Sequence, residues 1–212
     1  MKIGIGVTTY QREECLQNFL KALKQFPPKS EYIFHVAKDI PNIAKAKNEC
    51  LNALKECDYI FLFDDDTFPK QAEWDVPFIE SGQAYSLYMN ESYGVVQEMY
   101  DLTRYHDCSG CFMFLTKEIF EKVGYFNSAY GRYGYEHLGY FQRIKKLTSD
   151  WGFICLNATK NFIHSFDLDG TRGFNTYHAP TIDFEERILL SDMNYPIYEK
   201  EVGGDKIYFE YE

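Results

Sequence analysis

The 212-residue sequence lacks the features of a membrane-bound or secreted protein. No apolar run approaches the roughly 20 residues that a membrane-spanning helix needs. The opening Met1-Lys2-Ile3-Gly4-Ile5 predicts a strand rather than a secretory leader. We therefore expect no transmembrane segment and a cytoplasmic location, in which the six cysteines are reduced, buried thiols.

The sequence also has fewer positively charged residues than negatively charged ones. The chain has 22 Lys and Arg residues against 32 Asp and Glu residues, so its formal net charge is −10. This balance argues against nucleic acid or an anionic membrane surface as the main partner, because both attract basic proteins. It leaves a phosphate-bearing ligand open, since a bound cation would reverse the local field.

The cysteines do not complete a zinc or redox motif. Cys108-Ser-Gly-Cys111 has the spacing of a redox pair, but it lacks the strand-then-helix setting of a thioredoxin motif. The sequence has no second cysteine pair of this kind to complete a zinc site. It therefore favours neither chemistry at these two residues.

Aromatic residues, in contrast, make up 18% of the chain. Most of them must form a large aromatic core. A surplus of tyrosine also suits a cleft or an interface, because the side chain has an apolar ring and a polar tip. Flat rings of this kind can also stack on the faces of sugars.

The first third of the chain predicts alternating strands and helices. Apolar runs predict strands at residues 3–9, 32–37 and 59–63, and helical spacing predicts helices at 13–26 and 42–57. This order assembles most simply as a parallel sheet with right-handed crossovers. We therefore predict an α/β fold with a Rossmann-like, mostly parallel central sheet flanked by helices.

The rest of the chain is less regular. We predict helices at residues 73–80, 116–123, 136–147 and 183–190, and strands at 95–100, 111–115 and 153–156. Residues 1–100 are expected to form a nucleotide-binding α/β half, and residues 101–212 a mixed second half. Both halves are expected to belong to one continuous domain.

The most informative stretch follows the third predicted strand. Asp64, Asp65 and Asp66 come directly after its apolar run. Ligands of open α/β sheets bind at the carboxyl ends of the strands, and three adjacent carboxylates repel one another. A hard cation such as Mg²⁺ or Mn²⁺ explains them most simply, because it takes carboxylate oxygens and bridges to substrate phosphates. The alternative is a solvated acidic turn that ends the strand.

The order of motifs along residues 3–170 resembles that of the GT-A glycosyltransferases, particularly their family-2-like members. Asp64-Asp65-Asp66 matches the Asp-x-Asp motif of that family, and Gly134-Tyr-Glu-His137 lies where many members carry Gly-x-Glu-Asp. The other similar segments are Gly6-Val-Thr-Thr-Tyr-Gln-Arg12, Asn42-Ile-Ala-Lys-Ala-Lys-Asn48, Ser109-Gly-Cys-Phe-Met-Phe114, Phe120-Glu-Lys-Val-Gly-Tyr-Phe126 and Phe162-Ile-His-Ser165. The overall texture also resembles a virus-encoded glycosyltransferase domain used in capsid glycosylation by large algal viruses, which would place the protein in the host cytoplasm.

The resemblance implies a divalent metal, Mn²⁺ or Mg²⁺, that stabilises charge on the leaving diphosphate of a nucleotide-sugar donor. In this interpretation Asp66 is a direct metal ligand, and Asp64 binds the metal through water or holds the ribose. His164 is the third candidate ligand, because a neutral imidazole suits Mn²⁺. The alternative for His164 is a histidine with ordinary hydrogen bonds.

The resemblance also implies contacts to the donor nucleotide. The candidate residues are Thr8, Thr9, Arg12, Asp39, Lys47, Asp64 and Asp65. Thr8, Thr9 and Asp39 would meet the base or ribose, and Arg12 and Lys47 the base or the phosphates. Asp65 would hold Arg12 or Lys47, or lie behind the metal ligands. Arg12 as a solvated helix-start residue and Asp39 as a turn residue are the ordinary alternatives.

Glu136 and His137 are the candidate catalytic residues on the acceptor side. Inverting members of the family often use the Asp of Glu-Asp as general base, and His137 takes its place here. Alternatively, Glu136 is the base or an acceptor anchor, or it only caps its helix. A retaining enzyme would need no such base. The aromatic residues from Tyr125 to Tyr140 are expected to divide between acceptor stacking and the core.

The resemblance thus implies a metal-dependent glycosyltransferase that moves a sugar from a nucleotide-diphosphate sugar, expected to be a UDP-sugar, to a glycan or glycoprotein acceptor. A sugar nucleotidyltransferase is one alternative, but it would carry a glycine-rich phosphate loop where this chain has Thr8-Thr-Tyr-Gln-Arg12. A non-catalytic carbohydrate-binding module is the other. It would account for the aromatic residues but not for three acids at a strand end.

Overall fold

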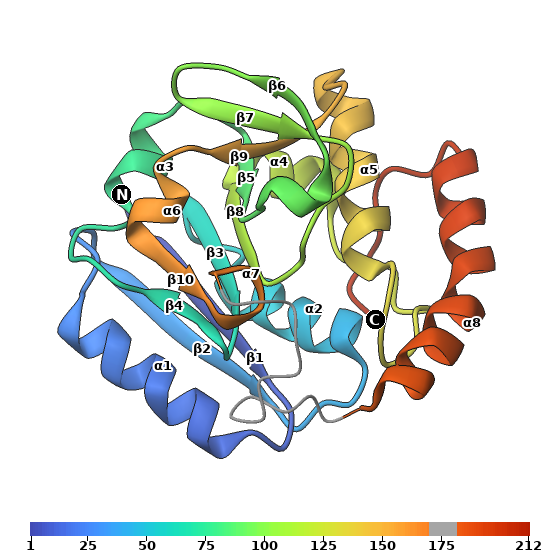
Figure 1. Ribbon diagram of the computed structural model, residues 1–212, viewed down its shortest axis with the longest axis horizontal. Coiled ribbons are helices and arrows are strands. Elements are labelled where there is room, and N and C mark those ends of the chain that lie inside the picture. The colour runs from blue at the N-terminus through green and yellow to red at the C-terminus, as the bar shows by residue number, and fades with distance from the viewer. Residues whose placement is uncertain (170–181) are drawn as a thin grey trace.

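The computed structural model describes residues 1–169 and 182–212. A five-stranded sheet lies at its centre, in the order β2-β1-β3-β8-β5 (Figure 1). The strands are β1 (Ile3–Thr9), β2 (Tyr32–Lys38), β3 (Tyr59–Asp64), β5 (Tyr85–Leu87) and β8 (Phe112–Thr116). β1 pairs in parallel with β2 and β3, and β8 runs antiparallel between β3 and β5. The predicted α/β fold with a mostly parallel sheet is confirmed.

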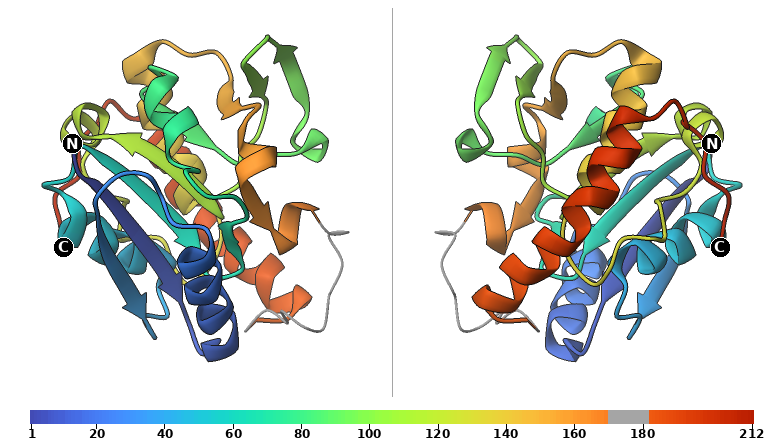
Figure 2. Two further views of the ribbon diagram at one scale, coloured as in Figure 1. Left: turned by 90° about the vertical axis from the view of Figure 1, so that its left-hand side faces the viewer. Right: turned by 90° about the vertical axis from the view of Figure 1, so that its right-hand side faces the viewer.

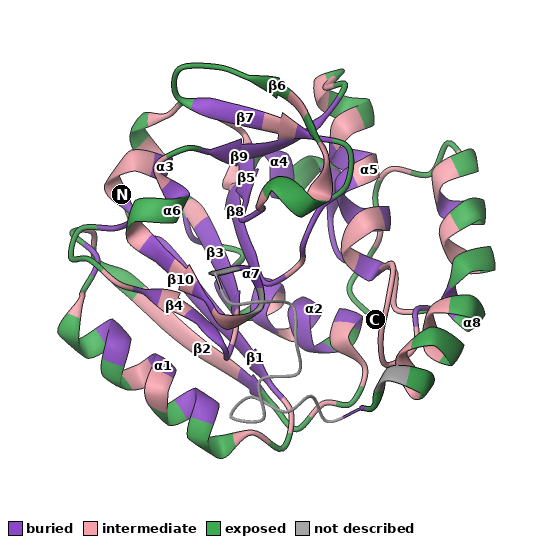
Figure 3. Cartoon of the chain, in the orientation of Figure 1, coloured by how far each residue is buried: buried purple, intermediate pink, exposed green. Residues whose placement is uncertain are grey.

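Helices α1 (Glu13–Gln25) and α2 (Ile43–Leu54) connect the three parallel strands, as predicted. α1 buries Leu16, Phe19 and Leu23, which recur at helical spacing on one face. The other face of α1 stays exposed to solvent (Figure 3). The apolar period seen in the sequence is therefore the face that covers the sheet.

α2 is capped by Asn42 and packs closely on β1. The Asn42 side chain accepts a hydrogen bond of 2.9 Å from the backbone N–H of Lys45, which caps the helix. A Cβ atom at Gly6 of β1 would lie 2.8 Å from the Cβ of Cys50. Glycine at position 6 therefore allows the helix to approach the strand closely.

Aromatic side chains fill the core around β3 and β8. Phe61 and Phe63 of β3 pack edge-on against Trp74, with ring centroids 4.9 and 5.5 Å apart. Phe63 also contacts Phe112 of β8 at 5.0 Å, and Phe61 contacts Phe78 at 5.7 Å. All five side chains are buried. Much of the aromatic content therefore stabilises the fold.

Two smaller sheets flank the central one. β6 (Val95–Glu98), β7 (Leu102–Tyr105) and β9 (Phe153–Leu156) form a three-stranded antiparallel sheet that projects to one side of the molecule (Figure 2). β4 (Thr67–Pro69) pairs antiparallel with β10 (Ile163–Ser165). This second pairing brings a late segment of the chain next to the residues that follow the acidic triplet.

Further helices lie between these strands and after them. Their bounds are α3 (Val76–Glu80), η1 (Glu91–Tyr93), α4 (Lys117–Val123), α5 (Glu136–Thr148), α6 (Thr159–Phe162), α7 (Phe166–Asp169) and α8 (Phe184–Gly203). α4 is capped at both ends, because the Thr116 hydroxyl accepts a bond from the N–H of Ile119 at 3.3 Å and Gly124 ends the helix at φ 68°. Within the described residues, no helix combines the length and the apolar character needed to cross a membrane.

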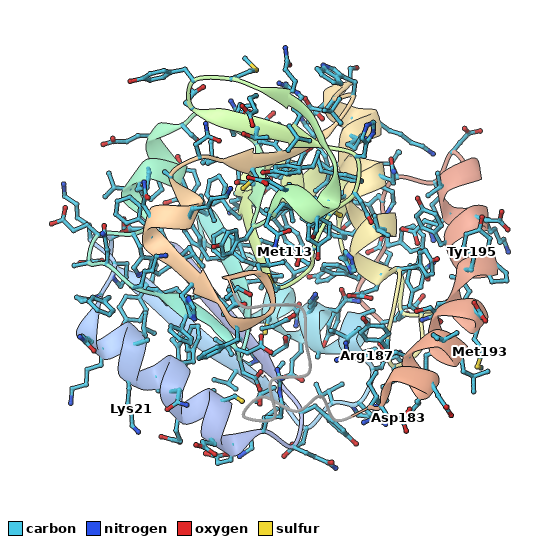
Figure 4. The ribbon with its side chains drawn as sticks, viewed as in Figure 1. Lys21, Met113, Asp183, Arg187, Met193 and Tyr195 are labelled. Carbon is cyan, nitrogen blue, oxygen red and sulfur yellow. The ribbon has the colours of Figure 1, made fainter. Side chains whose placement is uncertain are left out.

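α8 is much longer than the helix predicted at residues 183–190. It lies beside α5 at the edge of the molecule (Figure 1), with Arg187 on its inner side and Met193 projecting outward (Figure 4). Its inward residues include the buried polar side chains of Asn194 and Glu201. An apolar period cannot reveal a polar inner face, which is why the prediction ended too early.

The strand predicted at residues 153–156 has those bounds in the structure, and those predicted at 95–100 and 111–115 exist with shifted ends. The short strands β4, β5 and β7 were missed. Each missed strand has only three or four residues, too few to display an alternating pattern. The six cysteines are buried and free, as predicted.

Candidate active site

β1 and β3 end side by side and bring hydroxyls against carboxylates. Thr8 lies opposite Asp64 in the parallel register, and its Oγ1 donates a 2.9 Å hydrogen bond to Asp64 Oδ1. Thr9 Oγ1 donates a 2.6 Å bond to Asp65 Oδ2. The two threonines therefore orient two of the three acids at the carboxyl end of the sheet.

Arg12 neutralises the other side of the acidic triplet. Its Nε lies 3.2 Å from Asp65 Oδ2, its Nη2 contacts Asp65 Oδ1, and its Nη1 lies 2.9 Å from Asp66 Oδ2. Asp65 is fully buried, and Asp66 is 5% exposed. Burial opposes the positive charge of Arg12, but the two carboxylates outweigh it and raise the Arg12 pKa. Burial raises the pKa of Asp65 to about 6, although Arg12 favours its ionised form.

Lys47 connects the acidic triplet to α5. The side chain is 1% exposed, and its Nζ donates a 3.0 Å bond to the carbonyl oxygen of Gly110. The same Nζ lies 3.9 Å from Asp64 Oδ1 and 3.5 Å from Glu136 Oε1. Burial lowers the Lys47 pKa, but these two carboxylates outweigh it, so the net shift is upward. Lys47 therefore keeps its charge inside the protein.

Glycine at position 110 makes room for this network. A Cβ atom there would lie 3.0 Å from Lys47 Nζ and 3.0 Å from the His137 ring. A side chain would push both groups away. Gly110 thus provides a backbone carbonyl and open space at one position.

Glu136 is buried at the first turn of α5. It is 3% exposed, and its Oε1 contacts both Lys47 and His137. Burial favours the neutral acid, but the neighbouring His137 and Lys47 outweigh it and lower the Glu136 pKa to about 2. Glu136 is therefore an ionised anchor at neutral pH rather than a strong base.

His137 is held at both ring nitrogens. Nδ1 lies 3.1 Å from Glu136 Oε1, and Nε2 lies 3.1 Å from the carbonyl oxygen of Cys108. Both partners are acceptors, so the ring satisfies them fully only when it donates from both nitrogens. In this arrangement neither ring nitrogen is available to a ligand until one of the two contacts opens.

The backbone before Glu136 is strained. Tyr135 has φ 70° and ψ −12° in the left-handed region, and it follows Gly134 at φ 96°. A tyrosine in this region is uncommon, and such conformations gather at functional sites. The Tyr135 ring packs against Tyr195 and Tyr198 of α8, with centroids 5.6 and 5.1 Å apart, so α8 helps to hold the turn.

His164 lies on β10, opposite Phe68 of β4. Its ring lies between Phe68 and Phe166, with centroid distances of 5.2 and 4.8 Å. The backbone N–H of Phe166 donates a 3.1 Å bond to the carbonyl oxygen of Asp66. The structure therefore places His164 near the acidic triplet, 98 positions after Asp66 in the sequence.

Asp39 serves the turn after β2. It has φ 58°, and its Oδ1 accepts a 3.0 Å bond from the backbone N–H of Gln11. Its own N–H donates to the carbonyl oxygen of Thr9 at 2.9 Å. Asp39 thus forms the hydrogen bonds of a turn residue, the ordinary alternative given for it in the sequence analysis. Its exposed carboxyl group lies beside the ends of β1 and β2.

Comparison with known structures identifies the fold of the chain. The chain matches no protein-family model and no curated protein sequence. The catalytic domain of Drosophila β1,4-galactosyltransferase 7, in complex with xylobiose, is similar with a TM-score of 0.51 and 16% identity, over 89% of this chain and 79% of that chain. S. aureus TarS 1–349 in complex with UDP gives a TM-score of 0.51 and 14% identity, over 68% of this chain and 54% of that chain. GalNAc-T7 with UDP, GalNAc and Mn²⁺ gives a TM-score of 0.56 and 9% identity, over 74% of this chain and 43% of that chain.

The chain has a GT-A glycosyltransferase fold. At these identities the likeness is one of fold, and it confirms the fold that the motif order implied. The resemblance to a virus-encoded domain stays a prediction.

The acidic end of this GT-A sheet has donors that suit a hard metal. Asp64 and Asp66 carry carboxylate oxygens, and His164 carries an imidazole on β10, which pairs with β4 just after the triplet, a set that suits Mn²⁺. Among the described residues, however, no group of three His, Cys, Asp or Glu side chains is arranged to hold a metal ion. Asp66 instead bonds to Arg12. The residues fit the metal chemically, and a metal ion that bound Asp66 Oδ2 would have to replace Arg12 Nη1 there.

The GT-A fold also gathers residues that the sequence did not reveal. Asn194 of α8 accepts a 2.9 Å bond from the N–H of Gly131 and donates to the carbonyl oxygens of Tyr133 and Gly134 at 2.7 and 3.0 Å. Arg132 lies over the Tyr10 ring at 5.1 Å. A single asparagine in a helix gives no signal of such a role.

The aromatic residues around the start of α5 include both buried and partly exposed rings. Tyr125, Phe126, Tyr130 and Tyr140 are buried, and Phe126 stacks on Tyr140 with centroids 4.1 Å apart. Tyr133 is partly exposed on the same loop. It is therefore better placed than the four buried rings to meet a ligand.

Proposed function

We propose that the protein is a metal-dependent glycosyltransferase that transfers a sugar from a nucleotide-diphosphate sugar, a UDP-sugar, to a glycan or glycoprotein acceptor. The observation that carries this proposal is the acidic triplet at the carboxyl end of β3 in a GT-A fold. The similar structures of TarS and GalNAc-T7 contain UDP, and that of GalNAc-T7 also contains Mn²⁺. The β1,4-galactosyltransferase 7 structure contains xylobiose.

Asp66, Asp64 and His164 would hold Mn²⁺ or Mg²⁺. The metal would supply positive charge that stabilises the leaving diphosphate. Thr8 and Thr9 keep Asp64 and Asp65 oriented through their hydroxyl groups. These bonds keep the carboxylates in place before the donor arrives, which lowers the cost of binding it.

The donor would lie across the ends of β1, β2 and β3. Thr8, Thr9 and Asp39 border the place for the base and ribose. Arg12 and Lys47 supply positive charge toward the phosphates, and Asp65 fixes the Arg12 side chain. Residues 1–100 would thus bind the donor, and residues 101–212 the acceptor.

On the acceptor side, we assign His137 as the general base and Glu136 as the buried carboxylate that orients it. The Nδ1 bond to Glu136 fixes the ring and stabilises the imidazolium that forms when the acceptor hydroxyl loses its proton. For this role Nε2 must exchange the Cys108 carbonyl oxygen for the acceptor hydroxyl and start without its proton. Inversion at the anomeric carbon follows from this assignment.

A donor panel tests the function directly. The protein is incubated with a set of nucleotide sugars with and without Mn²⁺, and the release of free nucleotide diphosphate is measured, with sugar acceptors added in a second series. We expect Mn²⁺-dependent release from a UDP-sugar. Absence of release with every donor and acceptor, together with absence of UDP binding by calorimetry, would reject the proposal.

A further inference from the structure

Asp65, the central acid of the triplet, contacts Arg12 through both of its carboxylate oxygens. Asp65 has no exposed surface, and it receives bonds from Nε and Nη2 of Arg12 and from the Thr9 hydroxyl. Paired, planar contacts of this kind are the strong form of an Arg–carboxylate bond. Asp65 therefore fixes the position of the guanidinium and has little capacity left for another cation.

The third guanidinium nitrogen reaches the proposed metal ligand. Nη1 of Arg12 lies 2.9 Å from Asp66 Oδ2. One cation thus bridges two adjacent buried carboxylates, which would repel each other without it. A metal ion on Asp66 would lie within a few ångströms of this positive charge, and the two would repel each other.

The backbone keeps Arg12 at this place. Arg12 directly precedes α1, and its carbonyl oxygen accepts a 3.2 Å bond from the N–H of Leu16. The preceding Gln11, at φ 54°, is tied to Asp39. The backbone therefore holds Arg12 beside the acidic triplet whether or not its contact with Asp66 is open.

Lys47 does not share this position. It lies on the other side of the triplet, 3.9 Å from Asp64, and its hydrogen bond goes to Gly110. Arg12 is the cation that bonds directly to Asp66 among the ion pairs of the described residues.

We propose that Arg12 is a built-in counter-cation that competes with the divalent metal for Asp66. Metal binding turns the Asp66 carboxylate away from Nη1, while Nε and Nη2 keep the guanidinium on Asp65 at the edge of the site. The released nitrogen then faces the place of the donor diphosphate. Arg12 thereby weakens binding of the metal alone and strengthens binding of the metal together with the nucleotide. This inference rests on the proposed metal site.

The test is calorimetric titration of the whole chain with Mn²⁺ alone. Arg12→Met removes the competing charge, so we expect Mn²⁺ to bind about tenfold tighter, the size of one charge-assisted hydrogen bond. Arg12→Lys keeps a positive charge but loses the forked guanidinium group. Its Mn²⁺ affinity is expected to lie between those of the wild type and Arg12→Met. Lys38→Met is the matched control, because Lys38 is an exposed cation that pairs with Glu13 at the start of α1. It is expected to bind Mn²⁺ like the wild type.

A second variant guards against misfolding. Arg12→Met leaves Asp65 buried without its main partner, which can destabilise the protein. Arg12→Met combined with Asp65→Asn removes both charges, and the same tightening is expected. A second titration with UDP in the presence of saturating Mn²⁺ should show weaker UDP binding in both Met variants.

The outcomes separate the inference from the function on which it rests. If Asp66→Asn loses Mn²⁺ binding and neither Met variant binds it more tightly, the competition is wrong and the metal site stands. If Asp66→Asn binds Mn²⁺ as well as the wild type, the metal assignment itself is wrong. If neither wild type nor the Met variants bind Mn²⁺, both are wrong.

Discussion

Charged side chains are buried at the end of β3 and at the start of α5, but the two regions are held in different ways. At the end of β3, the acids follow their strand directly and are bound by Thr8, Thr9 and Arg12 from the neighbouring strand end. The loop before α5 depends on α8, some 60 residues later in the chain, through Asn194. One region is built by local chain order and parallel pairing, and the other by a distant helix.

Arg143 of α5 also depends on partners from distant parts of the chain. Arg143 is 1% exposed, and its guanidinium bonds to Glu201 Oε1 at 2.7 Å and to the carbonyl oxygens of Val123, Tyr125 and Ile207 at 2.7 to 2.8 Å. A single side chain thus joins α5, the end of α4, α8 and the C-terminal segment. We infer that the region of α5, α8 and the C-terminal segment is more easily separated from the rest of the fold than the ends of β1 and β3 are.

The largest expected effect is on stability. Arg143→Met leaves Glu201 as a buried, unpaired charge and removes the partner of three carbonyl oxygens, so we expect a loss of about 3–5 kcal/mol in the free energy of unfolding. Urea denaturation measures it. Lys122→Met, in an exposed pair with Glu118, should change stability by less than about 1 kcal/mol.

Hydrogen exchange on the Arg143→Met variant sharpens the comparison. Amides of α8 and of the loop before α5 should lose protection, and those of β1 and β3 should keep most of theirs. Equal loss of protection in both regions would show that they do not differ in this way.

The next effect is on catalysis. Asp66→Asn should lower kcat for nucleotide release about 10²–10³-fold, the range for removal of a charged group that stabilises the transition state. Its thermal midpoint should stay close to that of the wild type. Asp58→Asn changes an exposed acid at the opposite end of β3 and should leave kcat unchanged. Equal activity of the two variants would contradict the assignment of the donor site.

A pH series tests the buried acid of α5. The Glu136 pKa falls from an ordinary 4.5 to about 2 in the folded protein, so the group stabilises the fold above pH 4.5. That contribution is lost as the pH falls from 4.5 to 2, and it amounts to about 3 kcal/mol. Glu136→Gln should show a correspondingly shallower fall in unfolding free energy between pH 6 and pH 3. Parallel curves for the two proteins would mean that Glu136 titrates normally.

The smallest expected effect separates acceptor from donor. Asn194→Ala removes three hydrogen bonds to the loop before α5, so stability should fall by about 1–2 kcal/mol. The KM for the acceptor should rise, while slow hydrolysis of the donor stays unchanged. Asp192→Ala, on the exposed side of the same helix, is the control. An equal loss of both reactions would argue against a role confined to the acceptor.

Much of the donor region could be predicted from the sequence. The apolar run of β3 marks a buried strand, the acids follow it at once, and the periods of α1 and α2 mark the crossovers. Parallel strands joined by crossovers place their carboxyl ends at one edge of the sheet, and the pairing of β1 with β3 then brings Thr8 against Asp64. Local pattern is sufficient to locate this edge of the sheet, but not to decide that β3 pairs with β1 and not with β2.

The sequence by itself determined the α/β class, the first three strands and the two helices between them. It also determined the acidic triplet at the end of β3 and the position of Glu136 at the start of a helix. Only the tertiary structure decided which cation holds which acid: Arg12 bridges Asp65 and Asp66, and Lys47 lies between Asp64 and Glu136. It also decided that α8 supports the loop before α5. The physical reason is that such partners are chosen by burial and by hydrogen-bond geometry between segments that lie far apart in the chain, and neither quantity has a period that a sequence can display.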